Sequence, residues 1–122
     1  MRLSALLPML LSTVVTLPAL AQGAPRYLDL VNHAHNSVVS LQVAAHGQVN
    51  YAPVSLDGAL RGGGDSQTIA LRGEACRYDL RFDFADGRAL RYEDVDVCRY
   101  GKLRIRPFPP GVQDREYVVR AK

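Results

Sequence analysis

The segment CRYDLRFDF, residues 76–84, constrains the fold more than any other stretch, because it alternates almost strictly between two kinds of side chain. One parity carries aromatic and aliphatic residues, and the other carries arginines and aspartates. Successive side chains of a β-strand point to opposite faces, so a period of two predicts a strand with one buried face. The charged parity is expected to form a solvent-exposed stripe of alternating sign rather than an active site, and it consists of Arg77, Asp79, Arg81 and Asp83.

A turn signal and a second alternating segment follow this strand. Residues 85–87 read Ala-Asp-Gly, and glycine supplies the positive φ that closes a hairpin. Directly opposed residues share a face of the sheet. We therefore expect Phe84 to lie opposite Leu90 and Phe82 to lie opposite Tyr92, with both apolar pairs in the core.

Similar short segments fill the rest of the chain, with breakers between them. Expected strands are residues 26–32, 37–45, 49–56, 67–72, 102–106 and 115–120. In the second of these, the residues expected on one face are Val39, Leu41, Val43 and Ala45. Pro53 confines residues 49–56 to an edge strand or a broken one. Short strands with frequent turn signals predict an all-β fold, a compact antiparallel β-sandwich of about seven to eight strands.

The first 21 residues read as a secretory signal peptide rather than as part of this fold. Arg2 provides a positive start, residues 3–17 are largely apolar, and Ala19-Leu20-Ala21 has the A-x-A pattern of a cleavage site. Cleavage after Ala21 is expected to leave a single domain, residues 22–122, in the periplasm or outside the cell. No later stretch reaches about 18 apolar residues, so no membrane span is expected after signal removal.

Cys76 and Cys98 are the only two cysteines, and both lie in the expected exported domain. Disulfides persist in oxidising compartments, so we predict that these two residues are bonded. The expected hairpin register also sets them opposite each other. Val95 and Val97 fall on the wrong parity after the preceding apolar residues, which predicts a β-bulge near Glu93-Asp94. Such a bulge would make the bridge diagonal or place it just past the ladder.

Charge and motif content exclude several classes of function. The chain has 15 Lys and Arg against 12 Asp and Glu, and these alternate along the sequence instead of forming a basic face. A nucleic-acid partner is therefore not expected. No G-x-S-x-G elbow occurs, so the chain is expected not to be an enzyme, although a hydrolase with an unfamiliar site stays open as an alternative.

Two loops are candidate sites. RGGGDS, residues 61–66, has no lysine and is followed by a strand rather than a helix, so a turn is expected instead of a phosphate loop. Because small exported scaffolds carry function in loops, possible partner-binding residues are Arg61, Asp65, Ser66 and Asn32.

Metal binding is the second candidate chemistry. His33 and His35 are two residues apart, a spacing that copper and zinc accept, and His46 is a possible third ligand. Acidic residues near the hairpin offer calcium ligands without the spacing of a regular calcium loop: Asp83, Asp86, Glu93, Asp94 and Asp96. The histidines are better explained as solvated turn residues, and the acids as turn residues and a charged strand edge, so no cofactor is expected.

Five short motifs together resemble a group of small exported bacterial β-domain proteins that have no assigned activity. They are LDLVN, GGGDS, CRYD, FADG and DVC, and the resemblance covers residues 27–98. It implies a compact β domain with a bridged hairpin, and Asp79 matches the acid that follows the first cysteine. We therefore expect Asp79 to bond a neighbouring loop.

The leading functional hypothesis is an exported, non-enzymatic binding or accessory module whose partner is another exported protein. The alternatives are a protein that binds copper, zinc or calcium and an inhibitor of a secreted hydrolase. All three follow from a small stapled scaffold without a recognisable catalytic set, because fold alone does not determine function.

Overall fold

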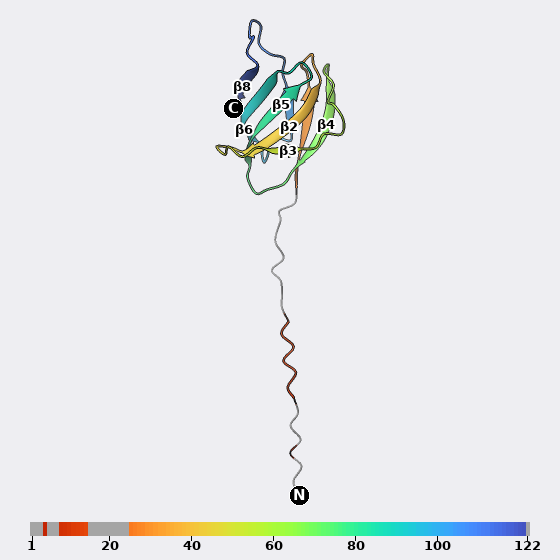
Figure 1. Cartoon of the computed structure of the whole chain (residues 1–122), viewed down its shortest axis with the longest axis vertical. Helices are drawn as coiled ribbons and strands as arrows, with labels where there is room; N and C mark the ends of the chain where they lie inside the picture. Colours follow the sequence, from red (N-terminus) through yellow and green to blue (C-terminus); the bar gives the residue numbers. More distant parts are fainter. Residues whose placement is uncertain (1–3, 5–7, 15–24, 122) are drawn as a thin grey trace.

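The computed structural model describes residues 4, 8–14 and 25–121 and contains eight β-strands and no helix in these residues. The strands are β1 (Arg26–Asn32), β2 (Val38–Ala45), β3 (Ala52–Val54), β4 (Asp65–Leu71), β5 (Arg77–Phe84), β6 (Ala89–Asp96), β7 (Lys102–Ile105) and β8 (Glu116–Arg120). The expected all-β fold is therefore confirmed, although the strand expected over residues 49–56 is reduced to its three central residues (Figure 1).

The strands form two mixed sheets. One has three strands in the order β4-β1-β7, and the other has five in the order β3-β2-β5-β6-β8. The expectation of a purely antiparallel sandwich is wrong in two places, because β7 runs parallel to β1 and β8 runs parallel to β6. Parallel neighbours need a crossover connection. After β6 the chain crosses to the three-stranded sheet, where β7 pairs with β1. It then returns to the five-stranded sheet, where β8 pairs with β6.

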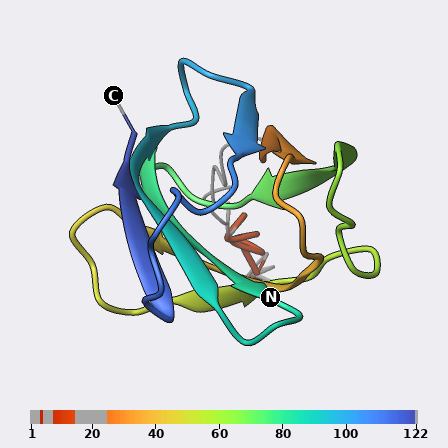
Figure 2. The ribbon, with the colours of Figure 1, turned by 90° about the horizontal axis from the view of Figure 1, so that it is seen from above.

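The two sheets pack face to face around one apolar core (Figure 2). Leu28, Leu30 and Ile69 come from the three-stranded sheet, and Phe82 and Leu90 come from the five-stranded sheet. Each of them is at most 3% exposed. Alternate residues of each strand supply this core, as the period of two in the sequence predicts.

A bulge in β2 changes the face that the sequence assigns to its first residues. The register with β5 shifts between Val38 and Ser40. As a result Val38 is buried and Val39 is 52% exposed, so the expectation that Val39 faces the core is wrong. Ala45 lies opposite the buried Tyr78 on the core side of the sheet and is half-buried. Leu41 and Val43, which follow the bulge, are buried as expected.

The β5–β6 hairpin has the expected partners in a different register. Phe82 lies opposite Leu90 and Leu80 lies opposite Tyr92, two positions from the pairing that we expected. The reason is a short turn: the N–H of Phe84 donates to the carbonyl of Arg88 at 2.8 Å. The loop therefore has three residues, a length that suits a glycine with positive φ near its end.

The bulge that the sequence predicts near Glu93-Asp94 is present. The β5–β6 register shifts by one residue between the Tyr78–Val95 pair and the Leu80–Tyr92 pair. Asp94 has φ = 60°, which is the left-handed conformation of a bulge. This shift returns Val95 to the core, where it is buried.

The predicted disulfide is confirmed. The sulfur atoms of Cys76 and Cys98 are 2.06 Å apart, and their Cα atoms are 5.1 Å apart. The N–H of Val97 donates to the carbonyl of Cys76, so the bridge joins Cys76 to the residue after its ladder partner. The link thus lies just past the ladder, as the bulge implies.

The expected cleavage site and most of the expected signal peptide lie outside the described residues. In residues 8–14, which are described, no helix or strand is assigned, and Met9, Leu10 and Leu11 are at least 85% exposed. The described residues contain no helix that is long and apolar enough to cross a membrane.

Candidate functional site

Asn32, one of the expected partner-binding residues, is fully buried at the end of β1. Its side-chain amide donates to the carbonyls of Asn36 and Leu60, at 2.9 and 3.0 Å, and its oxygen accepts from the N–H of Ala34. All the hydrogen-bonding groups of this side chain thus hold two loops to each other. A buried amide satisfied in this way is a structural element and has no group free for a partner.

The glycine-rich turn packs tightly against the same loop. A Cβ atom on Gly62 would lie 2.4 Å from the carbonyl oxygen of Ala34 and 2.6 Å from that of His35. The Asp65 carboxylate accepts from the N–H groups of Arg61 and Ser66, at 3.2 and 3.0 Å. The turn is therefore closed by its own side chains, as expected of residues such as aspartate in turns.

The aspartates of the other motifs also organise turns. Asp86 accepts from the N–H of Arg88 and from the Asn36 amide, both at 3.0 Å. Asp96 accepts from the N–H groups of Cys98 and Arg99, both at 3.1 Å. These aspartates belong to the motifs that carry the resemblance, and their side chains hold turns of the fold in place.

The structure does not assemble the histidines into a metal centre within the residues that it describes. His33 and His35 lie exposed in the turn after β1. Over the same residues, one group has three possible ligand atoms within 4.8 Å of one another, and it consists of Cys76, Asp96 and Cys98. Because the two cysteines are bonded to each other, their sulfur atoms are not thiolate ligands.

Asp79 corrects the expectation that all four charged residues of β5 lie in solvent. It is 6% exposed, and its Oδ1 lies 2.8 Å from Nδ1 of His46 in the loop after β2. The same oxygen accepts from the N–H of Asp94 at 2.9 Å, in the bulge of β6. The expectation that Asp79 bonds a neighbouring loop is thus confirmed.

His46 is bonded on one side and open on the other. Its side chain is 44% exposed, and Nδ1 is the atom that contacts the carboxylate. The hydrogen bond to Asp79 raises the pKa of His46, and the charges of Asp94 and Glu93 act in the same direction. A buried carboxylate that orients an imidazole is also found in catalytic and metal sites.

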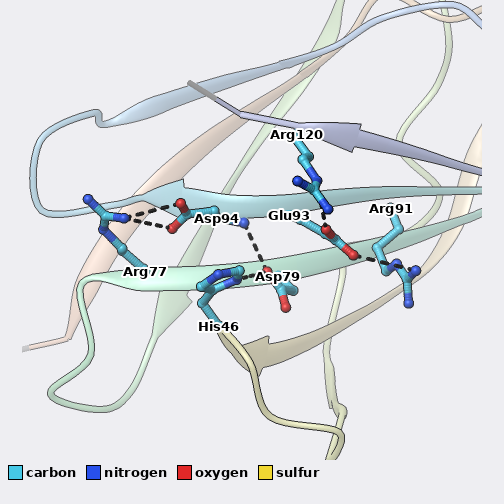
Figure 3. Close-up of polar contacts among 7 residues, drawn as sticks. All are labelled: His46, Arg77, Asp79, Arg91, Glu93, Asp94 and Arg120. Atoms are coloured by element: carbon cyan, nitrogen blue, oxygen red, sulfur yellow. Dashed lines mark hydrogen bonds and ion pairs between the residues drawn. The ribbon is translucent and has the colours of Figure 1, made fainter.

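Ion pairs surround the His46–Asp79 pair on the outer face of the five-stranded sheet (Figure 3). Arg77 contacts the Asp94 carboxylate at 3.1 Å, and Glu93 lies 3.5 Å from Arg91 and 3.7 Å from Arg120. Exposed pairs of this kind contribute between about 0 and 1 kcal/mol each. Opposite charges therefore neutralise one another across this face, and it offers neither a strongly basic nor a strongly acidic surface.

A groove opens between the edge of β3 and the end of β4, and we call it the β3–β4 groove. Its volume is about 720 Å³. Leu71, Val43 and Tyr78, which are buried, are among its lining residues, and Ala52 and Val54 of β3 line it as well. This volume is within the usual range of ligand sites, which are mostly apolar and concave.

The groove exists because the two layers differ in size. Ala52 lies opposite Val43, and Val54 lies opposite Leu41, so both β3 residues have the core-facing orientation. Ala52 is nevertheless exposed, and Val54 is half-buried. The inner face of β3 is thus incompletely covered by the three-stranded sheet. The sequence shows Pro53 as an edge signal, but the mismatch between the layers cannot be read from it.

No protein-family model and no curated protein matches the chain. A search of solved structures finds similarity to one described as the NMR structure of the protein from Eubacterium rectale. The two share 16% sequence identity with a TM-score of 0.45, and the match covers 75% of this chain and 98% of the other.

Proposed function

We propose that this protein is an exported, non-enzymatic binding module whose partner is another exported protein, and that the partner binds in the β3–β4 groove. The groove is the observation that carries the proposal, because it exposes core-facing positions of β3 in a cavity of about 720 Å³. The loops that the sequence favours as binding sites use Asn32 and Asp65 internally. The groove is therefore the better candidate for a partner.

The groove also has the chemistry of a recognition surface. Its floor is apolar, and at one end Arg72 and Glu74 offer polar groups of opposite sign near the opening. Binding surfaces typically have an apolar centre with a polar rim. A neighbouring arginine, Arg26, donates to the carbonyls of Glu74 and Ala75, and these hydrogen bonds hold that part of the groove lining in place.

Export is supported by the disulfide, since such bonds are stable in oxidising compartments. Mass spectrometry of the protein isolated from its own host without reductant tests it. The expected mass lacks residues 1–21 and two hydrogens. A mass that retains these residues, or two free thiols, would contradict export.

Partner binding is tested by site-specific photo-crosslinking in the native host. A benzoylphenylalanine replaces Ala52 in the groove, and the control carries it at Val118 on β8, at the opposite edge of the same sheet. We expect one discrete adduct from position 52, none from position 118, and loss of the adduct when Val54→Trp fills the groove. Equal labelling from both positions, or an adduct that persists in the filled groove, would contradict the proposal.

A further inference from the structure

The backbone hydrogen bonds of β1 determine which N–H and carbonyl groups of β4 point away from β1, toward the open edge of the sheet. The N–H of Asp29 donates to the carbonyl of Gly101 at 2.8 Å, at the start of β7. Backbone groups of successive strand residues point to opposite edges. Since Asp29 is directed to β7, Leu28 and Leu30 direct their backbone groups to β4.

Their partners in β4 are Ile69 and Gln67, so the backbone groups of these two residues are used in the β1–β4 ladder. Thr68 and Ala70 alternate with them and direct their N–H and carbonyl groups to the outer edge. Within the described residues β4 has no neighbouring strand on that edge, and the backbone groups of Thr68 and Ala70 have no backbone partner there. Four backbone groups are thus exposed in a row.

The other three edges of the sandwich are protected in ways that β4 is not. β3 has three residues, and Pro53 lacks an N–H group. β7 carries Lys102 and Arg104, and β8 has a charged residue at each end, Glu116 and Arg120. In β4 the residues whose backbone faces the edge are Ser66, Thr68 and Ala70, which are small and uncharged. Charges, prolines and short lengths are the usual protection of edge strands against added strands.

Part of this edge is covered by the chain itself. The Gln67 side chain accepts from the N–H of Asp57 and donates to the carbonyls of Asp57 and Gly58, all at 3.0 or 3.1 Å. These hydrogen bonds hold residues 57–58 against β4 near its start, so that part of the edge is covered. The portion from Thr68 onward is open, and it is the portion that borders the groove at Ala70 and Leu71.

From these observations, and on the basis of the proposed function, we infer that the groove takes an extended segment of the partner as a fourth strand on β4. Such a segment forms backbone hydrogen bonds with Thr68 and Ala70, as in strand addition to other open sheets. Its residues opposite Ile69 and Leu71 point between the layers, toward Ala52. The segment therefore carries small apolar side chains two positions apart.

The charges around the groove favour an uncharged segment. Arg72 and Glu74 are both exposed at one end of it and have opposite signs. The floor formed by Val43 and Leu71 is apolar, and a charged side chain buried there without a partner would be costly. The recognised pattern is thus alternating, with small apolar residues inward and uncharged polar residues outward.

The test uses a panel of capped pentapeptides of the pattern Thr-Xaa-Thr-Xaa-Thr, where Xaa is alanine, valine or leucine. Binding to the oxidised domain is followed by backbone amide NMR. We expect shifts and at least tenfold slower hydrogen exchange at Thr68 and Ala70. Peptides that leave both amides unchanged at millimolar concentration would overturn the inference. Labelling from Ala52 in the crosslinking experiment would still support the proposed function in that case.

Two matched N-methylated peptides separate strand addition from simple apolar contact. Only one edge of an added strand faces β4, so methyl groups on alternate amides of one parity should weaken binding at least tenfold. Methyl groups on the other parity should leave it unchanged. Equal binding of both peptides would overturn the inference, because it would show contact without a backbone ladder.

Variants of the domain give the reciprocal test. Ala70→Pro removes an N–H that faces the edge and not β1, so it should weaken peptide binding at least tenfold while the amide spectrum of the core is kept. Ala70→Val retains the N–H and should bind as the natural chain does. If Thr68 and Ala70 instead shift with protein concentration and sedimentation shows dimers, a second copy occupies the edge and the assignment to a different protein is wrong.

Discussion

Asp79 on β5 holds the imidazole of His46 at 2.8 Å and the backbone N–H of Asp94 at 2.9 Å with the same carboxylate oxygen. One buried side chain therefore joins the loop after β2 to the bulge of β6. The alternating pattern of β5 treats Asp79 as one more solvent residue. The bulge of β6 places the N–H of Asp94 within hydrogen-bonding distance of the Asp79 carboxylate. This hydrogen bond offsets part of the free-energy cost of burying the carboxylate.

The His46–Asp79 contact should stabilise the protein at low rather than high pH. The hydrogen bond to Asp79 raises the pKa of His46 in the folded state, so the folded protein binds the proton more tightly than the unfolded chain. This stabilisation is fully present below about pH 6.5, the ordinary value for histidine, and is lost as the pH rises through the raised pKa.

Urea unfolding at a series of pH values checks this. We expect the difference in midpoint between the natural chain and His46→Asn to be largest in acid and to shrink as the pH rises past the histidine pKa. Asparagine keeps an N–H donor near the carboxylate without the titrating charge, so it is the matched control. A difference that grew with pH would contradict the assignment.

Gly62→Ala should destabilise the fold strongly. The new Cβ would lie 2.4 Å from the carbonyl oxygen of Ala34, which is a backbone atom and cannot turn aside as the end of a flexible side chain could. Overpacking of this kind costs about 3 kcal/mol. Gly101→Ala is the matched control, because no atom lies within 4 Å of the Cβ there. Thermal unfolding should show a large drop for the first variant and little change for the second.

Tyr92→Phe should loosen the contact between the sheets. The Tyr92 hydroxyl donates to the carbonyl of Arg104 at 3.3 Å and accepts from the N–H of Arg106 at 2.9 Å, so it links β6 to the end of β7. Burial raises the pKa of the Tyr92 phenol. Loss of the hydroxyl leaves the Arg106 N–H without its partner and should cost about 1–2 kcal/mol of unfolding free energy. An unchanged urea midpoint would mean that water replaces the hydroxyl at no cost.

Replacement of both Cys76 and Cys98 by serine should lower stability without changing the fold. The bridge closes a loop with a sequence separation of 22, for which the chain-entropy estimate is about 3.4 kcal/mol. Because the bridge lies beside the ladder and not within it, amide NMR should show the same β5–β6 pairing in the variant. Loss of that pairing would show that the bridge is needed to set the register.

Much of the architecture can be predicted from local patterns. Alternation identifies the strands, compartment and cysteine count predict the disulfide, and the phase change at Val95 locates the bulge. The pairing of β7 and β8 cannot be predicted in the same way, because a parallel partner lies far along the chain. The hairpin register also depends on a choice of turn length that the Ala-Asp-Gly sequence alone leaves open.

The candidate site was harder to predict than the fold. Asn32 and Asp65 are polar loop residues, which is a common property of binding sites, yet in this protein they hold the loops together. The groove is formed by unremarkable residues such as Ala52 and Val54, and it arises from the difference in width between the layers. Only the edge signal of Pro53 lies in the sequence, since a concave surface is a property of packed layers.

The parallel pairings of β7 and β8 also set the order in which the molecule can be completed. Both strands follow β1–β6 in the chain, and each one adds an edge strand to one of the sheets. A ribosome makes them after β1–β6, so neither layer is complete when the β5–β6 hairpin has been synthesised. The β5–β6 hairpin, being local, can form and oxidise earlier. Docking of β7 and β8 thus completes the two layers around a hairpin that is already in place.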